Sequence, residues 1–419
     1  MNTRMLTTSW LFTVVTLPAG AQAQACPRIE TGDLTGPIAA VRYLADDALS
    51  GRLAGSAGER CAGEYIATRM QKAGLAPAGQ NGTYFQDVPL GSVAKPKAPA
   101  GTGRNVIGVL HGTDPRLRQE YIVVGAHYDH LGYGDFGSLS PEGRRIHNGA
   151  DDNASGVAVL LETAERLSQQ RPARSVLFVA FSGEESGLLG SMHFVEQPPV
   201  PLGQLKGMLN LDMVGRLRQG GLIVYGIGTA TEWEGIVTRA STAAGVKPGL
   251  ESDGYGASDH TSFYLKDIPV LHFFTNTHDE YHRPEDDWQL IDGDGLERVA
   301  TIFTAVTREV ASAERALTLV RGAGRPPAAS GQRGYGASLG TVPDMRPVER
   351  GVRLQGIRAG SAAEAAGLKA GDIIIQIDDE DIADLMGMTE ALRKRKPGQS
   401  VRIGVLRNGS PVTVTAVLR

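Results

Sequence analysis

Two adjacent carboxylates, Glu184 and Glu185, are the residues of this sequence whose spacing most directly suggests chemistry. They lie in FSGEESG, at the end of SVLFVAF (175–181), an apolar run typical of a buried strand. Because neighbouring like charges raise each other's pKa, the pair predicts a positive group nearby. If that group is a metal ion, one glutamate can bind it while the other transfers protons.

Acids and histidines also stand at the ends of other predicted strands and in nearby loops. VVGAHYDHLG carries His127 and Asp129, two residues apart and therefore on one side of a strand. In a parallel sheet the carboxyl ends of the strands meet at one edge, where ligands bind. Carboxylates together with imidazoles suit zinc. The remaining segments are HNGADDNASG with Asp151 and Asp152, LNLDMVGR with Asp212, and DEYHRPEDDW with His282.

Each of these segments has an ordinary structural explanation when it is taken alone. An aspartate before a helix usually caps it, and two glutamates that open a helix favour its dipole. These explanations weaken because all five segments lie at one edge of one predicted sheet. The charges also balance, since two Zn²⁺ ions, three carboxylates and one bridging hydroxide are neutral together. The three carboxylates are Asp152, Glu185 and Asp212.

The order of the predicted elements defines the fold class. Apolar runs at 120–127 and 175–181 are typical of strands covered on both faces, and an amphipathic helix (153–170) lies between them. Strands and helices then alternate as far as a long helix from about Gly295 to Ala316. This alternation predicts an α/β domain with a mainly parallel mixed sheet sandwiched by helices.

A second, smaller domain follows. Residues 321–334 are rich in proline, glycine and small side chains, which predicts a linker after a domain at 26–320. Residues 335–419 contain short strands, two short helices and a hairpin signal at Asn408-Gly409. The C-terminal domain is therefore expected to be small and β-rich.

The amino terminus and the composition indicate where the protein works. Residues 1–25 contain an arginine, an apolar stretch and small residues, which together are typical of a secretory signal peptide. No later segment is apolar enough to span a bilayer, so we expect an exported protein, periplasmic or extracellular. The net charge of −4 gives no bulk electrostatic case for a nucleic acid or an anionic membrane as partner.

The sequence contains two cysteines, Cys26 and Cys61. In an oxidising compartment such an even pair predicts a disulfide, and two unpaired thiols are the alternative. Cys26 directly after the predicted cleavage region also suggests a lipid anchor. The preceding Ala-Gln-Ala lacks the usual leucine, so we do not expect lipidation.

Six motifs occur in the chain in the order GAHYDH, GADDNASG, FSGEESGLLGS, NLDMVG, GYGASDH and YHRPEDD. Through them residues 35–315 resemble the di-zinc aminopeptidase family, which includes bacterial leucyl aminopeptidases and glutamate carboxypeptidase II. The resemblance implies the zinc exopeptidase fold and two Zn²⁺ ions per chain. It also implies the metal ligands, which are His127 and Asp212 on one zinc, Glu185 and His282 on the other, and Asp152 between them.

The resemblance implies the catalytic residues as well. Glu184 would act as general base and then as general acid, and Asp129 would orient His127 from outside the metal shell. Tyr255, in GYGASDH, would donate a hydrogen bond to the developing oxyanion, and Tyr281 is the alternative for that task. No ligand position of the family is missing. This argues against a catalytically silent member and against the glutaminyl cyclases, which share the fold but use one zinc.

The C-terminal segment SAAEAAGLKAGDIIIQIDDEDI resembles a PDZ domain of the type associated with bacterial proteases. The resemblance implies that Tyr335–Gly340 holds a peptide C-terminus with backbone N–H groups, and that the peptide adds as an extra strand. A stabilising appendage without a ligand is the alternative. Because a predicted linker separates this domain from the site motifs, we expect the domain to be dispensable for the turnover of small substrates.

We therefore interpret the chain as an exported metallo-exopeptidase. The favoured activity is that of an aminopeptidase, which hydrolyses N-terminal residues from peptides with a water bridging two zinc ions. A carboxypeptidase of the same fold is the first alternative, because Arg216 and Arg283 lie near site motifs and could bind a substrate carboxylate. A non-enzymatic peptide-binding protein that acts through the PDZ domain is the second.

Overall fold

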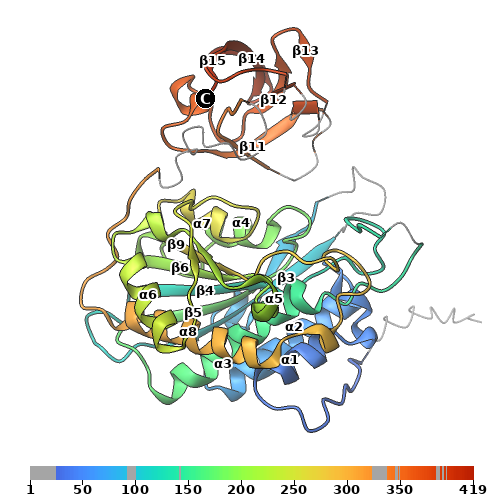
Figure 1. The fold of residues 1–419 in the computed structure, drawn as a ribbon, viewed down its shortest axis with the longest axis vertical. Coiled ribbons are helices and arrows are strands. Elements are labelled where there is room, and N and C mark those ends of the chain that lie inside the picture. The colour runs from blue at the N-terminus through green and yellow to red at the C-terminus, as the bar shows by residue number, and fades with distance from the viewer. Residues whose placement is uncertain are drawn as a thin grey trace, which may run out of the picture.

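Two units are visible in the computed structural model, a large α/β unit and a smaller β-rich unit formed by the C-terminal part of the chain (Figure 1). The structure describes residues 25–91, 101–140, 143–322, 337–344, 348, 350–383, 387–388, 391–392 and 394–419. Nearly all of the predicted signal peptide and of the predicted linker lies outside these residues.

The large unit is built on a mixed sheet whose centre is parallel. Strand β4 (Tyr121–His127) pairs in parallel with β5 (Ser175–Phe181) and with β6 (Leu205–Leu211). On the far side of β6, β9 (Val270–Phe274) is also parallel. Every residue of β4 and β5 is buried, as expected for strands covered on both faces. The parallel centre brings the carboxyl ends of these strands to one edge of the sheet.

Antiparallel strands flank this centre and complete the mixed sheet. Strand β3 (Thr102–Leu110) runs antiparallel to β5, and β7 (Ile223–Tyr225) runs antiparallel to β9. The short strands β1 (Ala76–Pro77) and β2 (Phe85–Pro89) pair with β3, and β8 (Gly249–Leu250) pairs with β7. The predicted sheet, mainly parallel and mixed, is confirmed in its parallel centre.

Helices cover both faces of the sheet (Figure 1). One face carries a large apolar cluster to which α3 (Gly156–Gln169) contributes Val157, Leu160, Leu161, Ala164 and Leu167, the inward face that the helical spacing predicts. The other helices of this cluster are α1 (Pro37–Leu44), α2 (Ala57–Lys72), α5 (Leu217–Gly220), α6 (Trp233–Ala243) and α8 (Gly293–Ser312).

The opposite face carries two shorter helices, α4 (Leu189–Glu196) and α7 (His260–Tyr264), which contact each other. Their aromatic residues Phe194 and Phe263 are buried in a second apolar cluster with residues of β4, β5 and β6. In Figure 1 the C-terminal unit lies beyond these two helices. None of the helices among the described residues is long and apolar enough to span a membrane.

Helix α8 ends earlier than the sequence pattern suggests. Asp292 caps its first turn by accepting a hydrogen bond from the Gly295 N–H at 3.1 Å. The helix ends at Ser312 rather than at Ala316. The buried guanidinium of Arg174 donates hydrogen bonds to carbonyl groups at this end, those of Val310 and Ala313. It therefore takes the place of the next helical turn, which a periodicity argument cannot foresee.

The C-terminal unit is a small antiparallel sheet with its own apolar core. Its strands lie in the order β10 (Thr341–Pro343), β11 (Val352–Ile357), β12 (Ile373–Ile377), β14 (Ser400–Arg407) and β15 (Ser410–Val417). A short strand β13 (Glu380–Asp381) pairs with β12, and a single helical turn forms α9 (Ala362–Ala365).

The hairpin between β14 and β15 forms where the sequence predicts it. Asn408 has a φ of 51° and Gly409 a φ of 79°, so both turn residues lie in the left-handed region. A two-residue turn of this kind matches the right-handed twist of the flanking strands. Residues 388–396, expected to form a helix, lie partly outside the described residues, and those described at 391–392 are helical.

Cys26 and Cys61 form a disulfide, with their Cα atoms 5.3 Å apart. The bond ties the segment before α1 to the second helix, in which Cys61 is buried. The expectation of a disulfide from the paired cysteines is thus confirmed over the alternative of two unpaired thiols.

We expect Cys61→Ser to lower the free energy of unfolding by about 2–4 kcal/mol, because the unfolded chain regains the freedom of a long loop. The two half-cystines are 35 residues apart. Urea unfolding of both proteins, each with and without a reducing agent, measures the difference. Reduction should destabilise the parent protein and leave the variant unchanged. Equal stability of the two oxidised proteins would contradict this expectation.

Candidate metal centre

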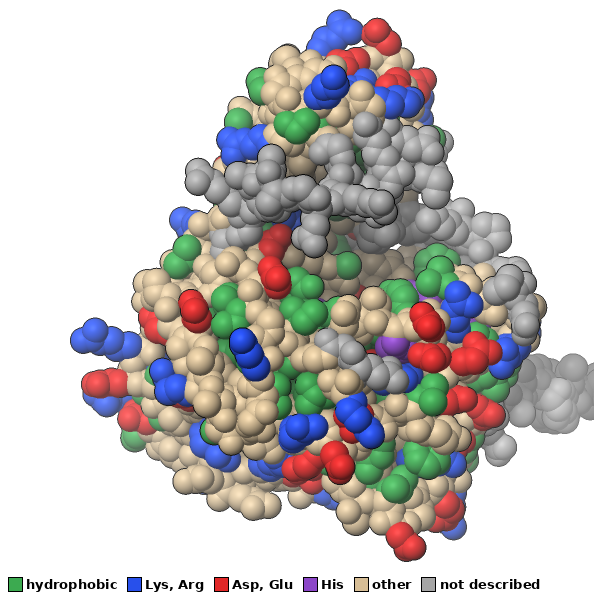
Figure 2. Space-filling view, in the orientation of Figure 1, with side chains coloured by type: hydrophobic (Ala, Val, Ile, Leu, Met, Phe, Trp, Pro, Cys, Tyr) green, Lys and Arg blue, Asp and Glu red, His purple; other side chains and the backbone are tan. Residues whose placement is uncertain are grey.

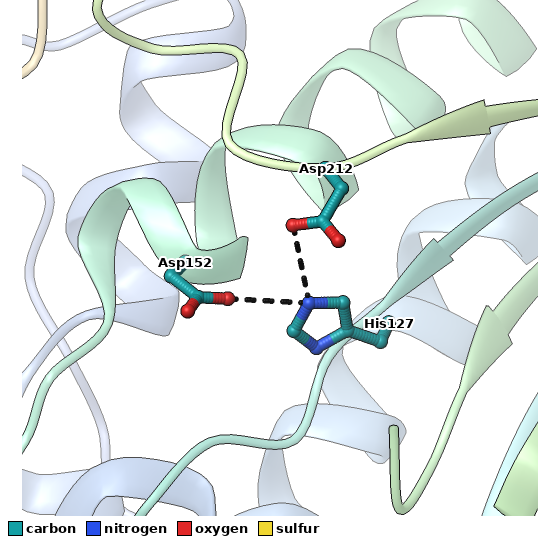
Figure 3. A group of neighbouring side chains, drawn as sticks. All are labelled: His127, Asp152 and Asp212. Carbon is teal, nitrogen blue, oxygen red and sulfur yellow. Dashed lines mark hydrogen bonds and ion pairs between the residues drawn. The ribbon is translucent and has the colours of Figure 1, made fainter. Parts of the chain in front are cut away.

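Three side chains from different elements converge at the carboxyl edge of the sheet (Figure 3). His127 is the last residue of β4, Asp212 follows β6, and Asp152 lies in the segment before α3. The Nε2 atom of His127 is 3.2 Å from Oδ1 of Asp152 and 3.4 Å from Oδ1 of Asp212. In Figure 3 both carboxylates point at this one ring nitrogen. A cation placed among these atoms would have three ligands.

A second group forms beside the first, on the other oxygen of Asp152. The Nε2 atom of His282 is 3.3 Å from Oδ2 of Asp152 and 3.2 Å from Oε2 of Glu185. Asp152 therefore directs one oxygen at His127 and the other at His282. This is the geometry required of a carboxylate that bridges two cations. The five ligands expected from the sequence are all brought together.

The charges of the group are consistent with a cation site. Burial raises the pKa of Glu185, as does Asp152, but contacts with His130 and His282 bring it down to about 2. Burial lowers the pKa of His282, yet its contacts with Asp152 and Glu185 raise it to about 11. The protonated imidazole of His282 thus supplies the positive charge between these two carboxylates. Metal ions would supply the same positive charge and leave the histidines neutral.

Glu184 lies beside the ligands. Burial raises its pKa well above the usual range, the charge of His127 opposes that effect, and Glu185 adds to it. Its backbone N–H donates a hydrogen bond to Oδ1 of Asp129 at 3.1 Å. His127, Glu184 and Glu185 each place one possible ligand atom within 4.8 Å of the other two, so a cation could bind among them. Glu184 is therefore close enough to act on a group bound at the site.

Asp129 contacts His127 differently from the expectation. The Nδ1 atom of His127 is 3.2 Å from the backbone oxygen of Asp129 and 3.8 Å from its carboxylate Oδ1. The main-chain carbonyl is therefore the nearer acceptor for an Nδ1–H group, which directs Nε2 towards the metal position. The carboxylate instead fixes the backbone of Glu184. Asp129 thus contacts both the His127 ring and the backbone of Glu184.

The two candidate tyrosines have different surroundings, although both line the same cavity. The ring of Tyr281 stacks on His282 at a centroid distance of 3.9 Å. Burial raises the pKa of Tyr281, and Asp152 and Glu185 raise it further. By contrast, the groups that act on Tyr255 after burial are the backbone of Ala359, which hydrogen-bonds its hydroxyl, and Arg358. Tyr281 is therefore the tyrosine that faces the ligands.

Three further residues support the ligands and were not identified from the sequence. The Nδ1 atom of His130 is 2.7 Å from Oε1 of Glu185. The hydroxyl of Ser258 donates to Oδ2 of Asp212 at 2.7 Å. Asp286 accepts hydrogen bonds from the backbone N–H of Asp152 and of its neighbour at 3.1 and 2.9 Å. His130 and Asp286 lie within the motifs GAHYDH and YHRPEDD, but only the contacts reveal their partners.

A cavity of about 350 Å³ opens above the ligands. Besides the ligands and Glu184, its walls include aromatic and small residues such as Tyr225, Phe274 and Gly256. None of the described residues that line it is a lysine or an arginine. Arg216 is buried elsewhere, with its guanidinium 3.2 Å from Asp286. Figure 2 shows the surface hollowed between the two units on this side of the molecule.

Histidine and carboxylate ligands at the carboxyl edge of a mixed sheet place this chain in the class of zinc exopeptidase folds. Residues 105–307 match peptidase family M28, and residues 339–418 match the PDZ domain. The chain therefore carries a domain of the peptidase family M28 type at residues 105–307, followed by a PDZ domain at residues 339–418. Both resemblances found in the sequence are confirmed.

Relatives of known name support this placement. Aminopeptidase YwaD of Bacillus subtilis (strain 168) is 30% identical over 224 residues, which cover 51% of this chain and 46% of that protein. Leupeptin-inactivating enzyme 1 of Streptomyces exfoliatus is 27% identical over 260 residues, which cover 61% of this chain and 52% of that protein. The chain thus spans about half the length of the curated relatives it matches.

Solved structures agree with the fold. A zinc aminopeptidase from Bacillus subtilis matches with a TM-score of 0.53 and 21% identity, over 70% of this chain and 98% of that one. A glutaminyl cyclase from Bacteroides thetaiotaomicron matches with a TM-score of 0.53 and 20% identity, over 67% and 98% of the two chains. At such identities the likeness establishes the fold alone. The chemistry depends on the residues of the site rather than on the fold.

Proposed function

We propose that this chain is a metallo-exopeptidase that acts as an aminopeptidase and removes N-terminal residues from peptides. The observation that carries the proposal is the lining of the cavity above the ligands. Carboxylates line it, and no lysine or arginine does so among the described residues. A lining of carboxylates suits the α-ammonium group of a substrate, whereas the described lining offers no lysine or arginine to pair with a C-terminal carboxylate.

Two zinc ions fit the donor set of the site. His127 and Asp212 would hold one ion, Glu185 and His282 the other, and Asp152 would bridge them through its two oxygens. Imidazole nitrogen and carboxylate oxygen are ordinary zinc ligands, and sites with open positions are typical of catalysis. Bound zinc would supply Lewis acidity, which activates water and polarises a peptide carbonyl.

Glu184 would carry the proton in this reaction. It lies next to the ligands without being needed as one, and Asp129 fixes its backbone. Burial raises the pKa of Glu184, which makes its carboxylate a stronger base. It would accept a proton from the attacking water and pass that proton to the leaving amine.

Tyr281 would stabilise the oxyanion. Its ring stacks on His282 and lines the cavity, and the charges of Asp152 and Glu185 raise the pKa of its hydroxyl. A hydroxyl that is held in place before the reaction lowers the energy of developing charge without reorganisation. Of the two tyrosines considered from the sequence, we therefore favour Tyr281 for this role, with Tyr255 as a wall of the cavity.

A carboxypeptidase of the same fold is less well supported. It requires a cation for the substrate carboxylate, and Arg216 is buried in an ion pair with Asp286. Arg216 also lies 3.8 Å from Glu280. Neither Arg216 nor Arg283 lines the cavity.

We further propose that the protein is exported, with residues 1–25 as signal peptide, 26–320 as peptidase domain, 321–334 as linker and 335–419 as PDZ domain. The disulfide between Cys26 and Cys61 supports a periplasmic or extracellular location, because such bonds persist in oxidising compartments. In this proposal peptide C-termini bind at the PDZ domain, as they do in other domains of this kind.

Hydrolysis of matched peptides tests the proposed activity. Leu-Gly-Gly, N-acetyl-Leu-Gly-Gly and Leu-Gly-Gly amide would be incubated with the purified protein, and its zinc content measured on the same sample. We expect cleavage of the free peptide and of the amide, no cleavage of the acetylated peptide, and close to two zinc ions per chain. Cleavage of the acetylated peptide together with loss of activity on the amide would identify a carboxypeptidase instead.

A further inference from the structure

The PDZ domain contacts the wall of the candidate active site through one arginine. Arg358 follows β11, and its guanidinium donates to Oδ2 of Asp253 in the large unit at 2.8 Å. The same guanidinium lies over the ring of Tyr255, 5.1 Å from the ring centroid. The backbone of the next residue, Ala359, hydrogen-bonds the Tyr255 hydroxyl. Tyr255 is thus held from the side of the PDZ domain at both its ring and its hydroxyl.

Apolar contacts continue this interface. Val342, the central residue of β10, is buried in the cluster that also contains Tyr255 and Tyr264 of the large unit. Gly356 of β11 packs so closely on Leu265 that an added Cβ atom would approach that side chain to 2.2 Å. These contacts form an apolar layer between the two units. The ion pair between Arg358 and Asp253 therefore belongs to a packed interface.

Polar contacts link the same interface to the surroundings of a metal ligand. Gln355 of β11 donates a hydrogen bond to the hydroxyl of Ser262 in α7 at 3.2 Å. The Ser262 hydroxyl is 3.0 Å from that of Ser191, and the Ser262 backbone N–H donates to the carbonyl oxygen of the buried Asp259 at 3.2 Å. Asp259 directly follows Ser258, whose hydroxyl contacts Asp212.

The cavities of the molecule also connect the substrate site with the PDZ domain. A second cavity, of about 1180 Å³, lies between the two units and is lined by Arg358 and by residues 338–341 of the PDZ domain. Tyr225 lines both this cavity and the one above the metal ligands. The side of the substrate site formed by Tyr225 and Tyr255 therefore adjoins the PDZ domain.

We propose that Arg358 is a positioning residue of the substrate site, which holds in place Tyr255, a wall of the cavity, and the segment 251–256 around it. The PDZ domain is then part of the site, in contrast to the expectation that it is dispensable for small substrates. The expected change in KM rests on the proposed aminopeptidase function. The contact of Arg358 with the large unit can be tested by hydrogen exchange, which requires no activity.

Four single variants test this proposal in the full-length protein. Arg358→Ala removes the ion pair and the ring contact, Arg358→Lys keeps the charge but loses the planar group over Tyr255, and Asp253→Asn removes the partner. Arg402→Ala is the matched control, because Arg402 also pairs with an aspartate at 3.0 Å but within the PDZ domain. Measurements are amide hydrogen exchange of 251–256, zinc content, and kcat and KM on leucyl anilide.

We expect Arg358→Ala to speed hydrogen exchange at 251–256 and to raise KM about tenfold, with kcat within about twofold and zinc content unchanged. Arg358→Lys and Asp253→Asn should give intermediate effects, and Arg402→Ala should behave as the parent. Unchanged exchange and unchanged KM in Arg358→Ala would overturn the proposal, as would equal effects in Arg402→Ala. If the parent protein cleaves no peptide, the proposed function fails, and the exchange data still decide whether Arg358 holds this wall.

Discussion

Glu184→Gln is expected to retain both zinc ions while kcat falls by about 10²–10⁴-fold, the usual contribution of a general acid–base group. The substitution keeps the size of the side chain and a hydrogen-bonding group but removes the proton acceptor. The five proposed ligands stay in place, since the Glu184 side chain is not among them and its backbone contact with Asp129 is unaffected. Zinc content and kcat measured on one dialysed preparation give both quantities.

Glu185→Gln is the matched comparison, one residue further along the chain. Glu185 lies 3.2 Å from His282 and 2.7 Å from His130, within the second group of ligands. Removing its charge leaves the two proposed zinc ions with one carboxylate fewer, so we expect weaker binding of one ion and partial return of activity with added zinc. If Glu184→Gln loses zinc and Glu185→Gln keeps it, the assignment of base and ligand is reversed.

Tyr281→Phe is expected to lower kcat by about 10²–10³-fold, the typical cost of losing one donor to an oxyanion. The ring and its stacking on His282 remain, so KM and zinc content should change little. Steady-state kinetics on leucyl anilide measure the two parameters separately.

Tyr255→Phe serves as the control for this prediction. Its hydroxyl is hydrogen-bonded from the PDZ domain by Ala359, so its loss should raise KM more than it lowers kcat. A large loss of kcat in Tyr255→Phe combined with an unchanged kcat in Tyr281→Phe would return the oxyanion role to Tyr255.

Local features of the sequence were sufficient to predict the elements that carry the site. The apolar runs at 121–127 and 175–181 form strands because residues buried on both faces have to be apolar throughout. The spacing of apolar residues in 156–169 forms a helix with the expected inner face. The end of α8 was misplaced by four residues, because Arg174 reaches it from a distant part of the chain.

The candidate ligands were likewise predictable, because each stands in a motif at the carboxyl end of a strand or in a loop beside it. That Asp152 directs its two oxygens at two different histidines was not predictable from spacing. The same holds for His130 beside Glu185 and for Ser258 beside Asp212, since these contacts join residues that are 55 and 46 positions apart.

The sequence by itself thus determined the order of strands and helices, the candidate ligands and the presence of a second domain, because periodicity and motif spacing are local properties of a chain. Only the tertiary structure decided which tyrosine faces the ligands and which faces the PDZ domain. Tyr281 stacks on a ligand, whereas Tyr255 is held by Arg358 from a different domain. The direction in which a side chain points depends on what packs against it, and those neighbours come from segments that no local pattern connects.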